Sequence, residues 1–240
     1  KNDIKYELEK AIYLSKSGRP GPVWLDIPID IQASDINLKK IRSFNPKKEN
    51  LLNTNPAPTN EFINSIISKI NKSKRPLIIF GHGVFLANAK KDARTLVKKF
   101  MIPVQTTWNS IDLIPDNYPM YFGRANSYGP RYANFIIQNA DYVLSIGARL
   151  GIQHTGYNVK EFCRDAFLDM VDLDPIEAKK PNLNVSRFTK CDAGKLLKNL
   201  IVKLDKRKKI KKDDYKKWIN YCKNIKKKYP ISASLNKISN

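Results

Sequence analysis

The residues Pro76-Leu77-Ile78-Ile79-Phe80 form an uninterrupted apolar run that stops at the turn Gly81-His82-Gly83. A run of this length without polar alternation is typical of a strand buried on both faces of a parallel sheet. Helices are predicted on both sides of the run, one from about residue 59 with Thr59 or Asn60 as its N-cap, and one over 87–100. The stretch therefore predicts a strand that alternates with helices, as in α/β proteins.

The same alternation of apolar runs and helices continues toward the C-terminus. Further strands are predicted at 102–106, 142–146, 166–172 and about 188–191, and helices over 132–139 and 192–204. Strands that alternate with helices form parallel sheets covered on both faces. The sequence therefore predicts an α/β domain over about residues 61–205. It should be Rossmann-like, with a parallel sheet of six or nearly six strands and helices on both faces.

The predicted strand ends carry residue types that suit a nucleotide. In open parallel sheets, ligands bind beyond the carboxyl ends of the strands. Glycines there let the backbone approach a phosphate, an arginine pairs with phosphate, and an aspartate accepts hydrogen bonds from ribose hydroxyls. Each residue alone also fits a structural role, and the third glycine of the dinucleotide fingerprint is absent. The candidate cofactor-binding residues are Gly81, Gly83, Thr107, Arg149, Asp172 and Asp174.

The first sixty residues follow a different pattern. Residues 3–17 are predicted to form an amphipathic helix, which ends at a Gly- and Pro-rich break. Residues 23–27 are predicted to form a short buried strand, stopped by Pro28 and separate from the central sheet. Residues 34–60 are polar and contain three prolines, which predicts a linker.

The chain is strongly basic, with a net charge of +22 from 44 basic and 22 acidic residues. Such a balance raises the possibility of nucleic-acid binding. Lysine dominates, however, with 34 Lys against 10 Arg, whereas base and planar phosphate recognition favour Arg. Residues 203–228 alone hold 13 basic and 3 acidic residues, a net +10, with few glycines or exposed-looking aromatic residues to interleave with bases. A solvated basic helix or linker is the preferred interpretation, and no nucleic-acid partner is predicted.

The sequence also bears on membrane contact, disulfide bonds and metal binding. No apolar run approaches the roughly 20 residues of a membrane helix. Three scattered cysteines do not make the pattern of a disulfide scaffold. Neither His82 nor His154 stands at metal-ligand spacing from a cysteine, so no metal site is predicted. These observations indicate a cytoplasmic protein that does not contact a membrane.

A stretch near the N-terminus is Gly18-Arg19-Pro20-Gly21-Pro22-Val23-Trp24-Leu25-Asp26-Ile27-Pro28. It resembles the end of the pyrimidine-binding domain of thiamine-diphosphate enzymes of the acetolactate synthase type. The stretch 76–83 resembles the first strand and turn of their central domain. Further resemblances follow in the same order, up to about residue 205. They are Pro103-Val104, Thr106-Thr107, Ile114-Pro115-Asp116, Gly123, Gly129, Tyr132-Ala133-Asn134, Ala140-Asp141, Gly147-Ala148-Arg149 and Asp172-Leu173-Asp174-Pro175 with Glu177.

The resemblance implies four parts of the chain. These are the end of the pyrimidine-binding domain (1–34), a linker (35–60), a deoxyhypusine-synthase-like central nucleotide-binding domain (61–205) and a basic linker into a diphosphate-binding domain (206–240). In this family the central domain holds FAD, ADP or no nucleotide, and the six candidate residues fall at its nucleotide contacts. The chain has Asn126-Ser127-Tyr128-Gly129 in place of Gly-Met-His-Gly, and Leu150-Gly151-Ile152-Gln153 in place of Phe-Asp-Asp-Arg. The choice between FAD and ADP therefore stays open.

The function that the resemblance implies is that of a fragment of a thiamine-diphosphate-dependent carboligase or lyase acting on a 2-keto acid. Thiamine diphosphate and magnesium would be held by other parts of the enzyme, which is expected to be a homodimer or homotetramer. The fragment is predicted to be catalytically incomplete, because no Gly-Asp pair of the family's magnesium motif occurs in it. Two alternatives are a free-standing nucleotide-binding domain of the deoxyhypusine-synthase or sirtuin-like class and a basic nucleic-acid-binding module.

Overall fold

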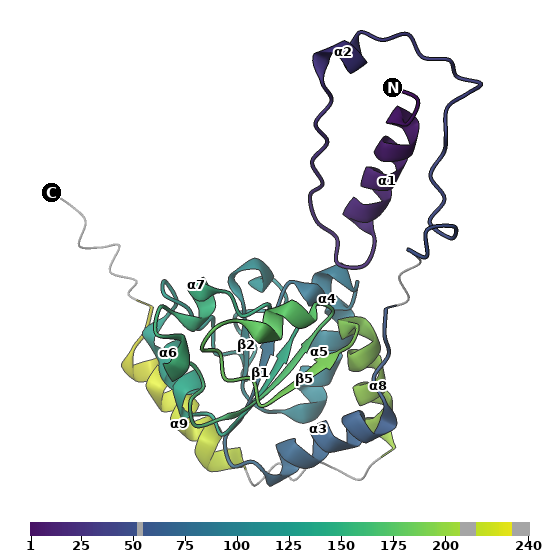
Figure 1. The fold of residues 1–240 in the computed structure, drawn as a ribbon. Helices are drawn as coiled ribbons and strands as arrows, with labels where there is room; N and C mark the ends of the chain where they lie inside the picture. The colour runs from purple at the N-terminus through teal and green to yellow at the C-terminus, as the bar shows by residue number, and fades with distance from the viewer. Residues whose placement is uncertain (52–54, 207–214, 232–240) are drawn as a thin grey trace, which may run out of the picture. The chain divides into compact units, whose positions relative to one another are not determined.

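The computed structural model describes residues 1–51, 55–206 and 215–231, which fall into two compact units. The first unit spans residues 1–55 and the second spans residues 56–240 (Figure 1). The second unit contains the sheet and all six candidate residues. We call it the sheet unit.

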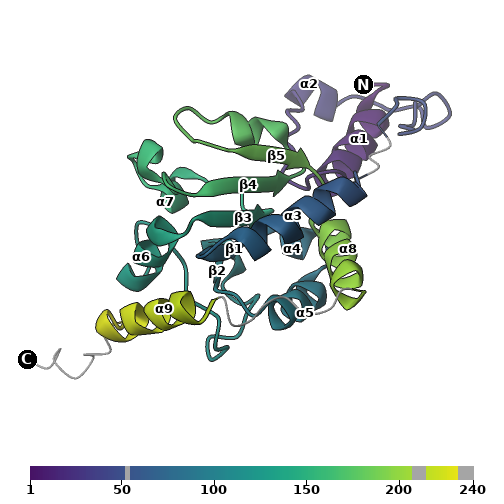
Figure 2. The ribbon, with the colours of Figure 1, turned by 90° about the horizontal axis from the view of Figure 1, so that it is seen from below.

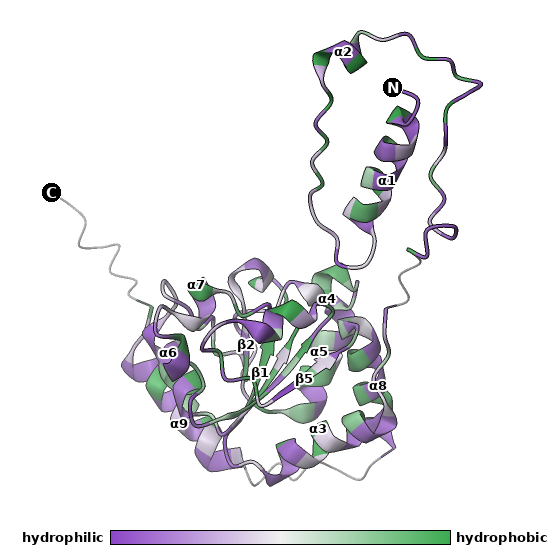
Figure 3. Ribbon diagram, viewed as in Figure 1, coloured by the Kyte–Doolittle hydropathy of each residue, from purple (hydrophilic) through white to green (hydrophobic). Residues whose placement is uncertain are grey.

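The sheet unit is built on five strands, each parallel to its neighbours. Their order in the sheet is β2-β1-β3-β4-β5. Every residue of β1 and β3 is buried, which explains why these strands are almost entirely apolar, with Ser145 in β3 as the exception. Figure 3 shows β1 mainly in green, the hydrophobic colour. The predicted α/β fold with a parallel sheet is confirmed, with five strands in the described part of the chain. The strands are β1 (Pro76–Phe80), β2 (Val104–Thr106), β3 (Tyr142–Ile146), β4 (Phe167–Asp172) and β5 (Arg187–Lys190).

Helices cover both faces of the sheet (Figures 1 and 2). On one face α3 (Asn60–Lys72), α5 (Lys90–Phe100) and α8 (Ala193–Asp205) share a core with Phe80 and Leu144. On the other face α6 (Arg131–Asn139) and α9 (Lys216–Lys228) share a core with Ile79 and Met170. Short helical segments lie in the connections: α4 (Gly83–Leu86), η1 (Trp108–Ser110), α7 (Ile152–Thr155), η2 (Val159–Glu161) and η3 (Pro175–Lys179). Within the described ranges no helix is long and apolar enough to cross a membrane.

Helix α3 follows the sequence prediction closely. The hydroxyl of Thr59 accepts a hydrogen bond from the backbone N–H of Phe62 at 3.2 Å, so Thr59 is the N-cap. The apolar residues recur every three or four positions and all lie in the core: Phe62, Ile63, Ile66, Ile67 and Ile70. Burial of this stripe fixes α3 across the sheet, directly before β1.

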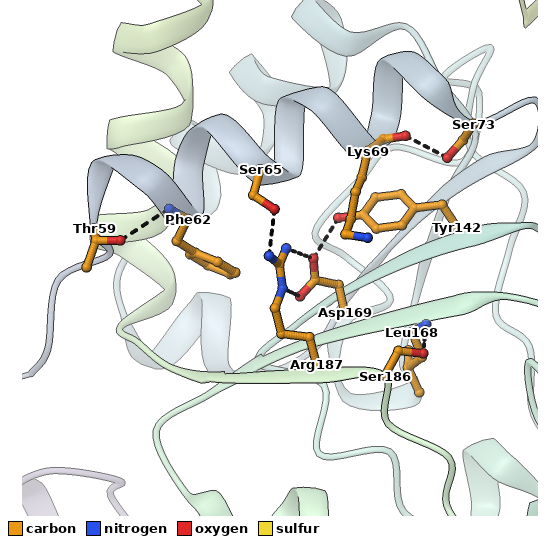
Figure 4. A network of polar contacts seen from close by, with 10 residues as sticks. All are labelled: Thr59, Phe62, Ser65, Lys69, Ser73, Tyr142, Leu168, Asp169, Ser186 and Arg187. Carbon is orange, nitrogen blue, oxygen red and sulfur yellow. Dashed lines mark hydrogen bonds and ion pairs between the residues drawn. The ribbon is translucent and has the colours of Figure 1, made fainter.

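A buried polar network also fixes α3 to the sheet (Figure 4). The carboxylate of Asp169 in β4 is fully buried and pairs with the guanidinium of Arg187 in β5, with Nε 2.9 Å from Oδ1. Tyr142 in β3 donates its hydroxyl to Oδ2 of Asp169 at 2.9 Å, and Arg187 donates to the hydroxyl of Ser65 on α3 at 2.6 Å. Burial and the neighbouring carboxylate raise the pKa of Tyr142 well above its ordinary value, so the phenol stays a donor. The pair of Asp169 and Arg187 therefore links β3, β4, β5 and α3.

The range 206–240, predicted as a basic linker, contains a helix that packs on the sheet unit. In α9, Trp218 and Cys222 are buried, and the indole of Trp218 donates to the carbonyl of Pro76 at 3.0 Å. The linker interpretation is wrong for residues 215–228, because apolar residues at helical spacing are hidden among lysines and bury one face of the helix. The remainder of the predicted linker, 207–214 and 232–240, lies outside the described residues.

The first unit contains α1 (Ile4–Lys16), as predicted, and the single turn α2 (Ile29–Gln32). The ring of Tyr6 on α1 packs edge-on against Phe44 with centroids 5.6 Å apart, and the carboxylate of Glu9 accepts from the backbone N–H of Phe44 at 2.8 Å. Part of the range predicted as a linker (35–60) therefore packs on α1 instead of only joining two parts.

The predicted buried strand at 23–27 is not present. Val23, Trp24 and Leu25 are exposed, and no strand pairs with this segment in the part of the chain that the structure describes. A strand is held by hydrogen bonds to a neighbouring strand, so an apolar run without such a neighbour stays extended and unpaired. The expectation that this segment stays outside the central sheet holds.

Candidate functional site

The six predicted site residues lie along one edge of the sheet. Because the strands are parallel, their carboxyl ends share an edge, and each candidate stands at or just after such an end. Strands lie about 4.8 Å apart, so the ends of β2 and β4, three positions apart in the sheet, are separated by roughly 14 Å. Only an elongated ligand can contact the whole row. In sheet order the row consists of Thr107 after β2, Gly81 and Gly83 after β1, Arg149 after β3, and Asp172 and Asp174 at the end of β4.

The chain leaves the sheet in opposite directions at the ends of β1 and β3. From β1 it continues through α4 and α5, which pack on the face shared with α8. From β3 it continues through α7 and η2, where Leu150 and Phe162 join the core of the other face. This change of side between adjacent strands is the topological switch point, where ligands bind in doubly wound sheets.

Glycines at the switch point bring the two loops into direct backbone contact. The N–H of Gly83 donates to the carbonyl of Gly147 at 3.0 Å. A Cβ added to Gly81 would lie 2.1 Å from Cα of Ala148, and one on Gly83 would lie 2.8 Å from Cα of Gly147. Gly147 itself has φ +59°, a conformation that favours glycine. The structure therefore gives Gly81, Gly83 and Gly147 a packing role, because they let the two loops touch through their backbones. We call these three residues the glycine floor.

Arg149 stands at the rim of this floor, held by a buried carboxylate. Arg149 and Leu150 both have positive φ, 54° and 50°. Nε of Arg149 lies 3.2 Å from Oε1 of Glu177 in η3, which is 5% exposed, while the Arg149 side chain is 69% exposed. The ammonium of Lys180 pairs with the other oxygen of Glu177 and donates to the carbonyl of Arg149. Two cations and one buried carboxylate leave a net positive charge at the end of β3.

The two predicted aspartates form a local turn at the end of β4. The backbone N–H of Asp174 donates to the carboxylate of Asp172 at 3.1 Å, and the carboxylate of Asp174 accepts from the N–H of Ile176 at 2.9 Å. Asp174 thus caps η3, the segment that carries Glu177. A further aspartate, Asp192, follows β5, is buried and caps α8 by accepting from the N–H of Lys195 at 2.9 Å. Its place before an apolar helical stripe is the sequence signal that could have added it to the row.

The two histidines have different surroundings, one exposed and one buried. Nδ1 of His82, on the exposed loop after β1, lies 2.9 Å from the carbonyl of Asn109. His154 in α7 is buried against the ring of Phe162, and burial lowers its pKa to about 4. Across the described ranges, no three His, Cys, Asp or Glu side chains gather where they could hold a metal ion.

The strand order, the switch point and the glycine floor define a doubly wound α/β domain, the class in which nucleotides bind at the carboxyl edge. The sequence model of the family described as "Thiamine pyrophosphate enzyme, central domain" matches residues 63–200. The chain belongs to this thiamine pyrophosphate enzyme family, and the sheet unit corresponds to its central domain.

Several curated proteins are similar to this chain in sequence. The chain is 32% identical over 225 residues to a probable acetolactate synthase large subunit of Methanococcus aeolicus, covering 90% of this chain and 37% of that protein. It is 30% identical over 231 residues to the acetolactate synthase large subunit of Corynebacterium glutamicum, covering 95% and 36%. The large subunit of acetolactate synthase isozyme 1 of Escherichia coli (strain K12) is 32% identical over 178 residues, which cover 74% of this chain and 30% of that protein. The chain therefore spans about a third of the length of these relatives.

Proposed function

We propose that the chain is the central part of a thiamine-diphosphate-dependent carboligase or lyase that acts on a 2-keto acid, working in the cytoplasm as a homodimer or homotetramer. The observation that carries the proposal is the family match over residues 63–200, on a parallel sheet of the matching class. The relatives named acetolactate synthase large subunits support the carboligase chemistry. In this proposal residues 1–34 close a preceding pyrimidine-binding domain, residues 35–60 connect it, and residues beyond α9 lead into a diphosphate-binding domain.

The residues of this chain do not fit thiamine diphosphate or magnesium. Bound thiamine diphosphate supplies an electron sink for the decarboxylation of a 2-keto acid. The resemblance implies a Gly-Asp-Gly string for the metal and a glutamate for the aminopyrimidine. The chain has no Gly-Asp pair, and its six glutamates lie in α1 or outside the pyrimidine-binding part. In this proposal the chain's own share is to hold a nucleotide at the carboxyl edge of the sheet.

The chain alone is expected to show no turnover of pyruvate with added thiamine diphosphate and magnesium. Loss of the groups that stabilise charge at a reacting centre lowers rates by several orders of magnitude. The measurement is pyruvate consumption by the isolated chain beside the full-length gene product. Turnover by the full-length protein alone agrees with the proposal, and turnover by the isolated chain shows that the active site has been placed wrongly.

We further propose that the carboxyl edge of the sheet binds FAD or ADP. Gly81, Gly83 and Thr107 would lie beneath the nucleotide, Arg149 would pair with its phosphate, and Asp172 and Asp174 would face its ribose. The switch point between β1 and β3 and the exposed guanidinium of Arg149 support this placement. The length of the row, roughly 14 Å, suits a ligand with well separated ring and phosphate groups.

The double variant Arg149→Ala/Asp172→Ala is expected to bind ADP and FAD about 10- to 100-fold more weakly than the wild type. A hydrogen bond to a charged group contributes about 1.5–3 kcal/mol, and 1.4 kcal/mol corresponds to a factor of ten. Calorimetric titration of the full chain measures the affinities. The matched control is Arg164→Ala/Asp165→Ala, which removes an exposed Arg–Asp pair away from the edge. Equal affinities of the Arg149/Asp172 variant and the wild type would refute the assignment.

A further inference from the structure

His154 is a buried side chain whose two ring nitrogens have no hydrogen-bond partner in the described part of the chain. It lies in α7, is 9% exposed and packs edge-on against the ring of Phe162, with the ring centroids 5.6 Å apart. A neutral imidazole has one N–H donor and one acceptor nitrogen, and within the described residues neither Nδ1 nor Nε2 is paired. Buried polar atoms are nearly always paired, so this ring is held where it gains no hydrogen bond.

The described surroundings of His154 supply no charge that would stabilise its protonated form. Burial alone shifts the pKa of His154, and it lowers that pKa to about 4. The 126–129 loop, which is hydrogen-bonded to α7, carries one ionisable side chain, Tyr128, and it is 79% exposed. Beside Phe162, burial raises the pKa of the Cys163 thiol, which therefore stays neutral. The charged side chains of the neighbouring segments are exposed or paired with one another: Lys160, Glu161, Arg164 and Asp165 after α7, and Arg149, Glu177 and Lys180 around the end of β3. The site therefore accepts only the neutral imidazole.

His154 is also the side chain that anchors α7 to the sheet unit. Of the four described residues of α7, it alone is buried. The turn is tied to a second segment through its backbone, because the N–H of Ser127 donates to the carbonyl of Gln153 at 2.9 Å. It is bounded by Gly151 and Gly156, where an added Cβ would meet nothing within 4 Å, and Gly156 has φ +78°. Packing requires neither glycine, so both are free to act as hinges for the turn.

We propose that α7 is a pH-sensitive switch, which opens when the imidazole of His154 takes up a proton. An imidazolium buried without a partner is costly, because the charge leaves water and gains no counter-charge in return. The ring regains water when α7 turns outward about its two flanking glycines. The hydrogen bond from Ser127 to Gln153 breaks in the same movement, so the 126–129 loop is freed together with α7. The switch does not depend on the binding of a nucleotide.

The direction of the pH dependence follows from the two pKa values of His154. In the closed form burial holds the pKa at about 4, and in the open form the ring returns to its ordinary value of 6.5. The open form therefore binds more protons between these two values. Closure is strongest above pH 6.5 and weakens as the pH falls toward 4. The equilibrium constant for opening should rise by about a hundredfold between about pH 7 and about pH 4.

The test is hydrogen exchange of the full chain, measured by mass spectrometry from about pH 7 to about pH 4 and corrected for the intrinsic exchange rate at each pH. In the wild type, exchange at 151–156 and 126–129 should rise by about a hundredfold over this range, while exchange in α3 should not. His154→Leu and His154→Gln cannot take up the proton and should lose this rise. His82→Gln is the matched control, because His82 is the other histidine of the chain, is exposed and should keep the wild-type profile.

The results separate the switch from other effects of acid. A rise confined to 151–156 and 126–129, present in His82→Gln and absent in both His154 variants, supports the switch. The proposal is overturned if both His154 variants keep the rise, or if the wild type shows none. An equal rise in α3 means that acid unfolds the whole sheet unit, and this result also overturns the switch. If one His154 variant does not fold, the other decides between these results.

Discussion

Asp169→Ala is expected to lower the free energy of unfolding of the sheet unit by about 3–5 kcal/mol, the usual cost of removing one partner of a buried ion pair. The substitution leaves the guanidinium of Arg187, only 27% exposed, without its carboxylate, and it removes the acceptor of the Tyr142 hydroxyl. Urea denaturation of the full chain, followed by tryptophan fluorescence, measures the change; of the three tryptophans, only Trp218 is buried and should respond strongly. Urea is preferred because it does not screen charges.

A matched aspartate separates this effect from the loss of any ion pair. Asp165 pairs with Arg164 on the surface, with its side chain 68% exposed. Asp165→Ala should cost no more than about 1 kcal/mol, because exposed pairs contribute little. Asp169→Asn keeps the shape and part of the hydrogen bonding, so its cost should fall between the two. Similar costs for Asp169→Ala and Asp165→Ala would contradict the central role of the network.

Gly81→Ala is expected to destabilise the sheet unit by about 3 kcal/mol or more, at the upper end of overpacking costs. The added Cβ would meet Cα of Ala148 and the carbonyl of Gly147, each at 2.1 Å. Both atoms belong to backbone, so no rotation of a side chain relieves the clash and the two loops must separate. Urea denaturation again measures the cost.

Gly151→Ala provides the control on the same edge of the sheet. Gly151 has φ −71°, and a Cβ there would meet nothing within 4 Å. Alanine at such a position should be neutral or stabilise by up to about 1 kcal/mol, because it restricts the unfolded chain. A Gly81→Ala protein as stable as Gly151→Ala would show that the two loops are not held together by their glycines.

Strands β1 and β3 were predictable because they are buried on both faces, whereas β5 is only partly buried. Full burial leaves a nearly continuous apolar run in the sequence, as at 76–80 and, apart from Ser145, at 142–146, and a helix N-cap such as Thr59 has a local signature. The segment 23–27 has the same kind of run without a pairing strand, and composition does not distinguish the two cases. Helix α9 was not predicted because its many lysines were typical of a linker, although Trp218 and Cys222 stand four residues apart, as on one face of a helix.

For the candidate site, the sequence predicted only where its residues lie along the sheet. The rule that ligands bind beyond parallel strands places Arg149 and Asp172 on one edge whatever their exact neighbours. The pairing of Arg149 with Glu177 joins residues from two loops, and the contact of Trp108 with Arg124 joins two others. Such contacts depend on how loops fold back on each other, and no spacing in the sequence encodes them.

The glycine floor also limits how this domain can be redesigned. Its surface is made of main-chain atoms at 81–83 and 147, which are the same whatever ligand is desired, and a side chain added at Gly81 or Gly83 meets backbone. For the nucleotide proposed at this edge, a change of ligand preference is therefore confined to side chains beside the glycines, such as Arg149 and those of η3. Substitutions there avoid the backbone clash that a side chain at Gly81 or Gly83 would cause.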